Sequence, residues 1–75
     1  MAKQTIIINP LDNVAVALCN LQKGGIYEGV TLAEDVAKGH KFALRDIKQG
    51  ENIIKYGSPI ACATADIKKG GHVHT

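Results

Sequence analysis

Short apolar segments separated by polar corners recur along the whole chain and predict β-strands. Most are rich in β-branched residues and too short for stable helices. In the segment NVAVALC, apolar residues occupy both alternating faces, which is typical of a central strand buried on both sides. TLAEDVAK at 31–38 offers a helical alternative, but glycines on either side leave too little length for a helix. The predicted strands cover residues 5–9, 13–19, 29–33, 40–44, 52–56 and 59–65, and the HVH at 72–74.

A corner pattern occurs four times: Asp or Asn, an apolar residue, two further residues, Gly, two residues and another apolar or aromatic residue. We expect the Asp or Asn side chain to accept backbone N–H groups two or three residues further on. Glycine then takes a positive φ and ends a short 3₁₀ turn, so that a strand follows. The spacings are too irregular for a solenoid. The copies are NLQKGGIY from Asn20, DVAKGHKF from Asp35, DIKQGENI from Asp46 and DIKKGGHV from Asp66.

The length allows one small domain over residues 1–75, and the strand pattern predicts that this domain is all-β. A chain of this size buries only about 60% of its unfolded surface, and its 45% hydrophobic content includes just three aromatic residues. A net charge of +2 argues against a nucleic-acid binder. The absence of a signal-like or membrane-spanning apolar run predicts a cytoplasmic protein. Cys19 and Cys62 read as small buried residues, with a disulfide as the alternative.

Three motifs, GHKFAL, IKYGSPI and DIKKGGHVH, give the chain a specific family resemblance. With NPLDNVAVAL they resemble the N-terminal small domain of the altronate and galactarate dehydratase family of sugar-acid lyases. Two residues, Ala61 and Gly71, depart from the usual family pattern. The resemblance implies an SAF-type β-clip fold and a large catalytic dehydratase domain or subunit as partner. It also implies β-elimination of water from a sugar-acid carboxylate, assisted by a divalent metal, Fe²⁺.

The three histidines are the candidate chemical groups. His72 and His74 alternate along the predicted last strand and share one face, with Cα atoms roughly 6 to 7 Å apart. His40 follows the glycine of an equivalent corner. Two imidazoles alone make a weak metal site, and a terminal HxH is often a polar, frayed end. With the resemblance, we predict His40, His72 and His74 as catalytic residues, His72 and His74 as metal ligands, and Lys41 as a substrate-carboxylate contact, against the alternative of a solvated edge lysine.

Two classes of function remain open at this point. The chain is a component of a hydro-lyase that is inactive alone, or a non-catalytic module that docks onto a large subunit or onto itself. Convergence of the histidines favours the first, and their dispersal favours the second. A third alternative keeps the family but expels sulfite, as the small subunit of a sulfolactate sulfo-lyase. We expect an oligomer, because several short strand edges need covering.

Overall fold

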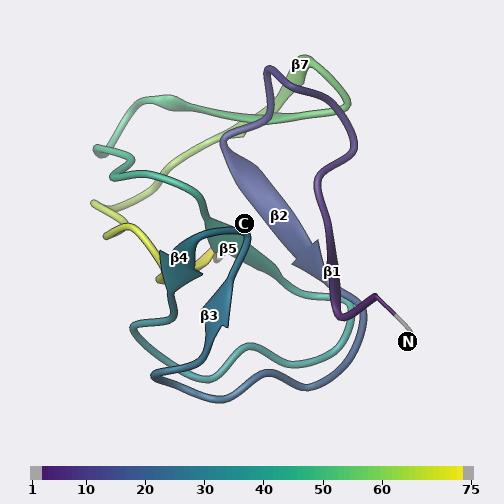
Figure 1. The fold of residues 1–75 in the computed structure, drawn as a ribbon. Coiled ribbons are helices and arrows are strands. Elements are labelled where there is room, and N and C mark those ends of the chain that lie inside the picture. The colour runs from purple at the N-terminus through teal and green to yellow at the C-terminus, as the bar shows by residue number, and fades with distance from the viewer. Residues whose placement is uncertain (1–2, 74–75) are drawn as a thin grey trace.

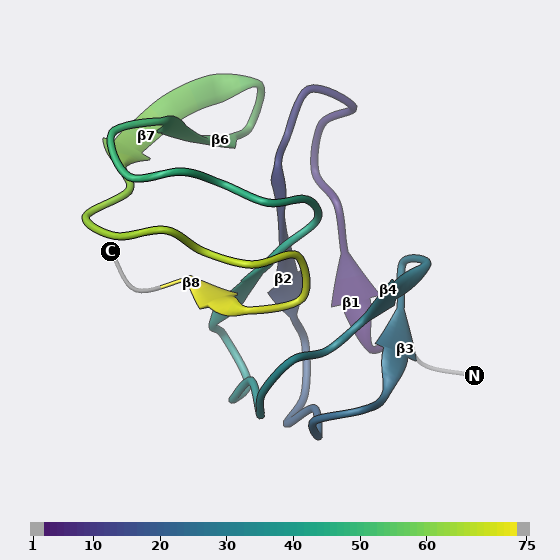
Figure 2. The same ribbon diagram turned by 90° about the vertical axis from the view of Figure 1, so that its left-hand side faces the viewer.

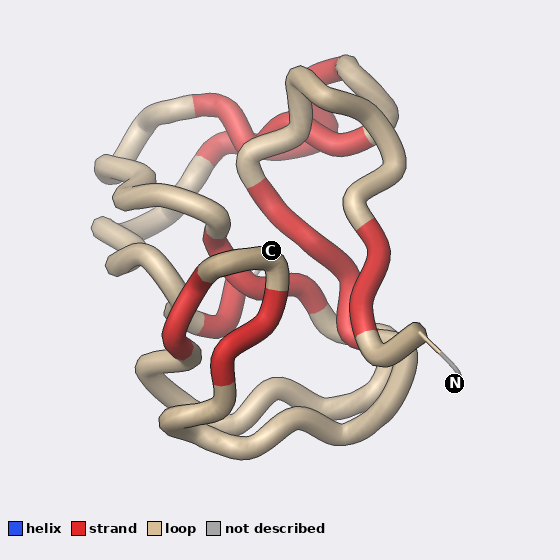
Figure 3. The backbone as a smooth tube through the Cα atoms, viewed as in Figure 1, coloured by secondary structure: helices blue, strands red, loops and turns tan. Residues whose placement is uncertain are grey.

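Eight short strands and no helix make up residues 3–73, the part described by the computed structural model (Figures 1 and 3). All seven predicted segments contain strand. Six of these strands are shorter than predicted, and the last segment extends beyond the described residues. The all-β expectation is confirmed. The pattern missed β3, whose Ile26 is exposed. No helix in this range could cross a membrane. The strands are β1 Thr5–Ile6, β2 Val14–Ala17, β3 Ile26–Tyr27, β4 Val30–Thr31, β5 Lys41–Ala43, β6 Asn52–Lys55, β7 Ser58–Cys62 and β8 His72–Val73.

A four-stranded antiparallel sheet in the order β1-β2-β5-β8 runs through the middle of the molecule. Alternate residues of β2 feed two different hydrophobic clusters. Ala15 and its cross-strand partner Phe42 belong to one cluster, while Val14 and its partner Ala43 belong to the other. Since both faces of β2 are covered, the prediction of a central strand buried on both sides is confirmed. The strand ends at Ala17, before the exposed Leu18 predicted to continue it.

The four corner motifs pair two by two. Leu21 of the first copy bridges Val36 of the second, and Ile47 of the third bridges Ile67 of the fourth. Each bridge has two backbone hydrogen bonds of 2.7–2.9 Å. The apolar residue of each motif therefore turns inward, as predicted, but it does so against the matching residue of another copy.

The Asp and Asn caps act across these pairs, which corrects the expectation that each caps its own turn. The Asn20 side chain accepts the N–H of Lys38, and Asp35 accepts the N–H of Lys23. Asp66 likewise accepts from Gln49. Because two such turns lie side by side, each Asp or Asn side chain accepts an N–H of the neighbouring turn.

The corners are single turns and not the 3₁₀ turns expected from sequence. In each, one backbone hydrogen bond spans three residues, such as His40 N–H to the Ala37 carbonyl at 2.9 Å. The intervening glycine, Gly39 in this copy, has a φ of +86°. That conformation breaks the series of negative φ values that a second 3₁₀ hydrogen bond would require.

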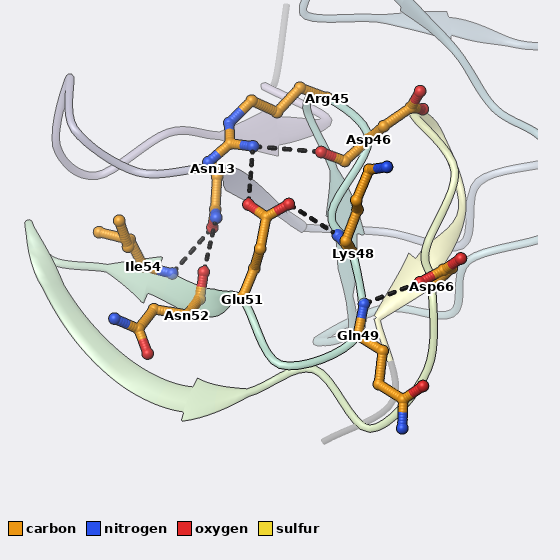
Figure 4. A network of polar contacts seen from close by, with 9 residues as sticks. All are labelled: Asn13, Arg45, Asp46, Lys48, Gln49, Glu51, Asn52, Ile54 and Asp66. Atoms are coloured by element: carbon orange, nitrogen blue, oxygen red, sulfur yellow. Dashed lines mark hydrogen bonds and ion pairs between the residues drawn. The ribbon is translucent and has the colours of Figure 1, made fainter.

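Buried polar side chains tie the β6–β7 hairpin to the sheet (Figures 2 and 4). The Asn13 side chain accepts the N–H of Ile54 at 2.8 Å and donates to the Asn52 carbonyl at 2.9 Å. Asp12 accepts the N–H of Gly57 from the hairpin tip at 2.8 Å. Because these residues are almost fully buried, their hydrogen bonds fix the hairpin at one end of β2.

Both cysteines are free thiols, so the disulfide alternative is not realised in this structure. Cys19 is half-buried, packed against the Phe42 cluster. Cys62 is exposed, which contradicts the prediction of two buried cysteines. The reason is that β7 pairs only with β6 and leaves most of its side chains in solvent.

Candidate functional site

His40 projects from the corner of the second motif copy, at the other end of β2 from the β6–β7 hairpin. Its carbonyl accepts the N–H of Ala17, the last residue of β2, at 2.8 Å. Gly39 directly precedes it, and the positive φ there directs the chain from the turn into β5. His40 is therefore held by backbone hydrogen bonds while its side chain stays exposed.

His72 opens β8 and reaches the same place from the other end of the sequence. Its cross-strand partner is Phe42, and directly paired residues of antiparallel strands share a face of the sheet. His40, two residues before Phe42, comes to that same face. The sheet register therefore brings together two histidines that are 32 residues apart.

The two imidazoles contact one another directly. His40 Nδ1 and His72 Nε2 are 2.7 Å apart, and the ring centroids are 4.9 Å apart with the planes inclined by 28°. A hydrogen bond between two imidazole nitrogens needs one that carries a proton and one that offers a lone pair. We call His40 and His72 the histidine dyad. In such a contact one imidazole donates and the other accepts, in roles set by their tautomers.

Glu34, which sequence reasoning missed, anchors the start of β8. Its Oε2 accepts the backbone N–H of His72 at 3.0 Å, and the Ala33 N–H donates to the Gly70 carbonyl at 2.9 Å. Glu34 lies 38 residues from His72 within an ordinary polar stretch. No spacing in the sequence could have indicated this contact.

A groove of about 270 Å³ runs beside His72. Its lining is mostly apolar, but Glu34, Thr64, Asp66 and Lys68 lie along it with His72. Groups of these types can hydrogen-bond a hydroxylated acid. The groove is shallow and formed by one small domain, whereas sites for small molecules usually enclose most of the ligand. It therefore offers one side of a site.

Of the two other predicted site residues, the structure describes only Lys41, which is not gathered with the dyad. His74 lies outside the described residues. Lys41 pairs with Val73 and Val16, whereas Phe42 pairs with His72, so the register directs Lys41 to the opposite face of the sheet. Its role as a carboxylate contact stays a prediction.

The dyad does not fit a complete metal centre. Among residues 3–73, no three His, Cys, Asp or Glu side chains gather as ligands. Two imidazole nitrogens are fewer than the three or four protein ligands that bound transition metals normally take. Any ion here would need ligands from outside the described part of the chain.

The comparison with known proteins gives a consistent result. Residues 3–75 match the family model described as the altronate/galactarate dehydratase SAF domain. Altronate dehydratase of Escherichia coli is 57% identical over 75 residues, which cover 95% of this chain and 15% of that protein. Altronate dehydratase of Bacillus subtilis is 41% identical over 76 residues, again 15% of its length. The chain thus spans about a seventh of these dehydratases.

A smaller relative has a different name. The (2R)-sulfolactate sulfo-lyase subunit alpha of Paracoccus pantotrophus is 44% identical over 46 residues. The match covers 61% of this chain and 69% of that subunit. Similar sequences therefore occur both as a small part of a long chain and as most of a small subunit.

Proposed function

Because the chain belongs to the altronate/galactarate dehydratase SAF-domain family, we propose that it forms one wall of the active site of a sugar-acid dehydratase. The rest of the site belongs to a large catalytic domain or subunit. The family's small domain is a β-clip, in agreement with the helix-free arrangement of short paired strands. The observation that carries the proposal is the 2.7 Å contact between His40 Nδ1 and His72 Nε2.

The proposed reaction is β-elimination of water from a hydroxylated carboxylate to give a 2-keto-3-deoxy acid. It requires a base for the proton beside the carboxylate, stabilisation of the enediolate, and an acid for the departing hydroxide. Imidazole changes its protonation state near neutral pH and serves in either proton-transfer role. Two imidazoles in direct contact suit a step in which a proton is taken from one carbon and delivered to a leaving oxygen.

Stabilisation of the enediolate needs positive charge that the dyad does not provide by itself. We propose a divalent metal, Fe²⁺ as the family resemblance implies, held mainly by residues of the large catalytic part. Such an ion supplies Lewis-acid stabilisation when bound. His72 and His74 remain proposed contributors to its coordination, and the chain's own part is to present imidazole donors at the rim.

The proposal is tested by reconstitution. The chain is mixed with the part of E. coli altronate dehydratase outside the matched segment and with Fe²⁺. We measure 2-keto-3-deoxy acid from altronate and galactarate, and sulfite from sulfolactate. Product should require the chain and should fall at least about 100-fold for His40→Ala and for His72→Ala. Gln22→Ala, an exposed polar change on another corner, is the matched control and should keep full activity.

Two alternatives have distinct outcomes in the same experiment. A docking module would be needed for product, yet both histidine variants would retain it. A sulfo-lyase component, favoured by the match to most of the sulfolactate sulfo-lyase subunit alpha, would support release of sulfite from sulfolactate and give no keto-deoxy acid. Activity that survives omission of the chain would refute a catalytic role.

A further inference from the structure

Two segments without charged residues form a surface at the end of the molecule opposite the histidine dyad, with the Lys55 ammonium at its border, 4.7 Å from the centroid of the Tyr56 ring. Charged residues make up 21% of the chain, yet the segments 4–11 and 56–65 contain no Asp, Glu, Lys or Arg. Both segments lie largely in solvent. We call the surface formed by residues 7–11 and 56–62 the uncharged face.

Strand β7 is an exposed edge within this face. It pairs with β6 on one side only, and four of its five residues are exposed. Solvent-facing edge strands are usually protected by charged side chains, proline or a covering element. Among these devices β7 carries only Pro59, which removes one N–H donor. The remaining edge is open to another strand or to an apolar surface.

Specific contacts fix the second segment against this hairpin. The Gly57 N–H donates to Asp12 Oδ1 at 2.8 Å, and a Cβ added at Gly57 would lie 2.8 Å from Asn9 Nδ2. The loop that ends at Leu11 is therefore packed on the hairpin tip, and both lie together at the upper end in Figures 1 and 2. Leu11 is 70% exposed and Tyr56 59% exposed. Two large apolar side chains thus flank one rigid contact.

We infer that the uncharged face is the surface by which this domain docks onto the large catalytic part of the dehydratase. This inference rests on the proposed function. The dehydratase relatives devote only 15% of their length to the matching segment, so a much larger body of protein accompanies it there. In the sulfo-lyase relative a similar sequence forms most of a separate subunit, where only a non-covalent surface could hold it.

A stable contact would take a substantial share of this domain's surface. A standard interface takes about 800 Å² from each partner, which is about a sixth of this chain's 4675 Å² surface. The face exposes Ile8, Leu11, Tyr56 and Ile60, and tyrosine is among the residue types enriched at binding hot spots. The complementary surface should be apolar, with a strand or backbone edge aligned to β7.

The test measures binding between the chain and the part of E. coli altronate dehydratase outside the matched segment, by biolayer interferometry. The double variant Leu11→Lys with Ile60→Lys places two charges in the uncharged face. Its matched control is Ile26→Lys with Leu18→Lys, because Ile26 is 70% exposed and Leu18 40% exposed, against 70% for Leu11 and 44% for Ile60. Circular dichroism and thermal unfolding verify that both variants remain folded.

The double variant should weaken binding about tenfold or more, and the control should not. Equal binding by both variants, equal loss in both, or no binding by the wild-type chain would overturn the inference. Light scattering supplies a further outcome. If the wild-type chain alone is a dimer that the double variant dissociates, while binding to the large part is unchanged, the face joins two copies of this chain and the inference is wrong.

Failure of this inference differs from failure of the proposed function. The histidine dyad lies at the opposite end of β2, so the large catalytic part must contact both ends of this domain. Charges on the uncharged face do not alter the proposed catalytic groups at the other end. A complex that forms through this face but gives no keto-deoxy acid would refute the function and retain the interface. An active complex whose binding is unaffected by the double variant would retain the function and refute the interface.

Discussion

Asp46 caps a turn that lies 23 residues further along the chain, where its Oδ1 accepts the backbone N–H of Lys69 at 2.8 Å. The reciprocal bond joins Asp66 to the N–H of Gln49 at 2.8 Å, as Figure 4 shows. Two turns from distant parts of the sequence are therefore closed by one another's side chains. This exchange, with the backbone bridge between Ile47 and Ile67, fixes the last corner immediately before His72.

Replacing Asp46 should disturb the turn at Lys69 and leave its own turn largely intact. We expect Asp46→Ala to lower the free energy of unfolding by about 1 kcal/mol, as for loss of a helix cap, measured by urea denaturation. Amide hydrogen exchange should accelerate at Lys69. The control Asp46→Asn keeps an acceptor oxygen and should retain most of the stability. Faster exchange at Gln49 alone would contradict the crossed arrangement.

Gly70 should tolerate alanine far less well than Gly50. Both have positive φ, +83° and +87°, so alanine at either position costs roughly 1–2 kcal/mol of backbone strain. At Gly70 an added Cβ would also collide with the Thr31 carbonyl oxygen, whereas at Gly50 it would meet nothing within 4 Å. Gly70→Ala should therefore cost about 1–3 kcal/mol more. Thermal unfolding measures the difference, and equal losses would argue against close contact at Gly70.

Asn13 should contribute more to the free energy of unfolding than Asn52, the other asparagine near the hairpin. Its side chain makes two hydrogen bonds to β6 and is 3% exposed. Asn13→Ala leaves the Ile54 N–H and Asn52 carbonyl without these partners, at an expected cost of about 2–3 kcal/mol. Asn52→Ala, an exposed change that retains the Asn52 carbonyl, should stay within about 0.5 kcal/mol of wild type. A reversed order in chemical denaturation would refute this placement of Asn13.

Glu34 should act as a positioning residue for the histidine dyad. Loss of its bond to the His72 N–H in Glu34→Ala should shift the His72 amide resonance and speed its hydrogen exchange. In the reconstituted enzyme we expect kcat to fall about 10-fold to 100-fold with little change in KM. Glu34→Gln keeps an acceptor oxygen and should restore both the slow hydrogen exchange of the His72 amide and kcat. A loss of stability without any change in the ¹⁵N signals of the imidazole rings would indicate a merely structural role.

Glu51 should make stability dependent on acidic pH. The N–H of Lys48, and then the Arg45 guanidinium at 3.3 Å, hold the pKa of Glu51 below its ordinary value of 4.5 (Figure 4). A lowered folded-state pKa stabilises the protein above the ordinary value, and this stabilisation is lost as the pH falls through the lowered one. Urea unfolding should find Glu51→Gln less stable than wild type at about pH 7 and equal to it at about pH 2. A difference that persists in acid would refute this origin.

The sequence by itself determined the local preferences of this protein. The unbroken apolar run in NVAVALC specified a strand with two buried faces, because side chains along a strand point alternately to opposite sides. Four Asx–apolar–Gly motifs specified corners, because glycine adopts positive φ without strain. The motifs around His40 and His72 also indicated the family, and with it the β-clip fold that the comparison supports.

Only the tertiary structure decided which of these elements meet. The Asx side chains cap neighbouring turns and not their own, because antiparallel bridging places two corners side by side. The register of β5 with β8 joins His40 to His72 and turns Lys41 away, and Glu34 reaches His72 across 38 residues. Such contacts depend on strand order and register, which local residue preferences do not encode. A periodic pattern predicts which side of a strand is buried. The packing of the whole chain decides which residues contact that side.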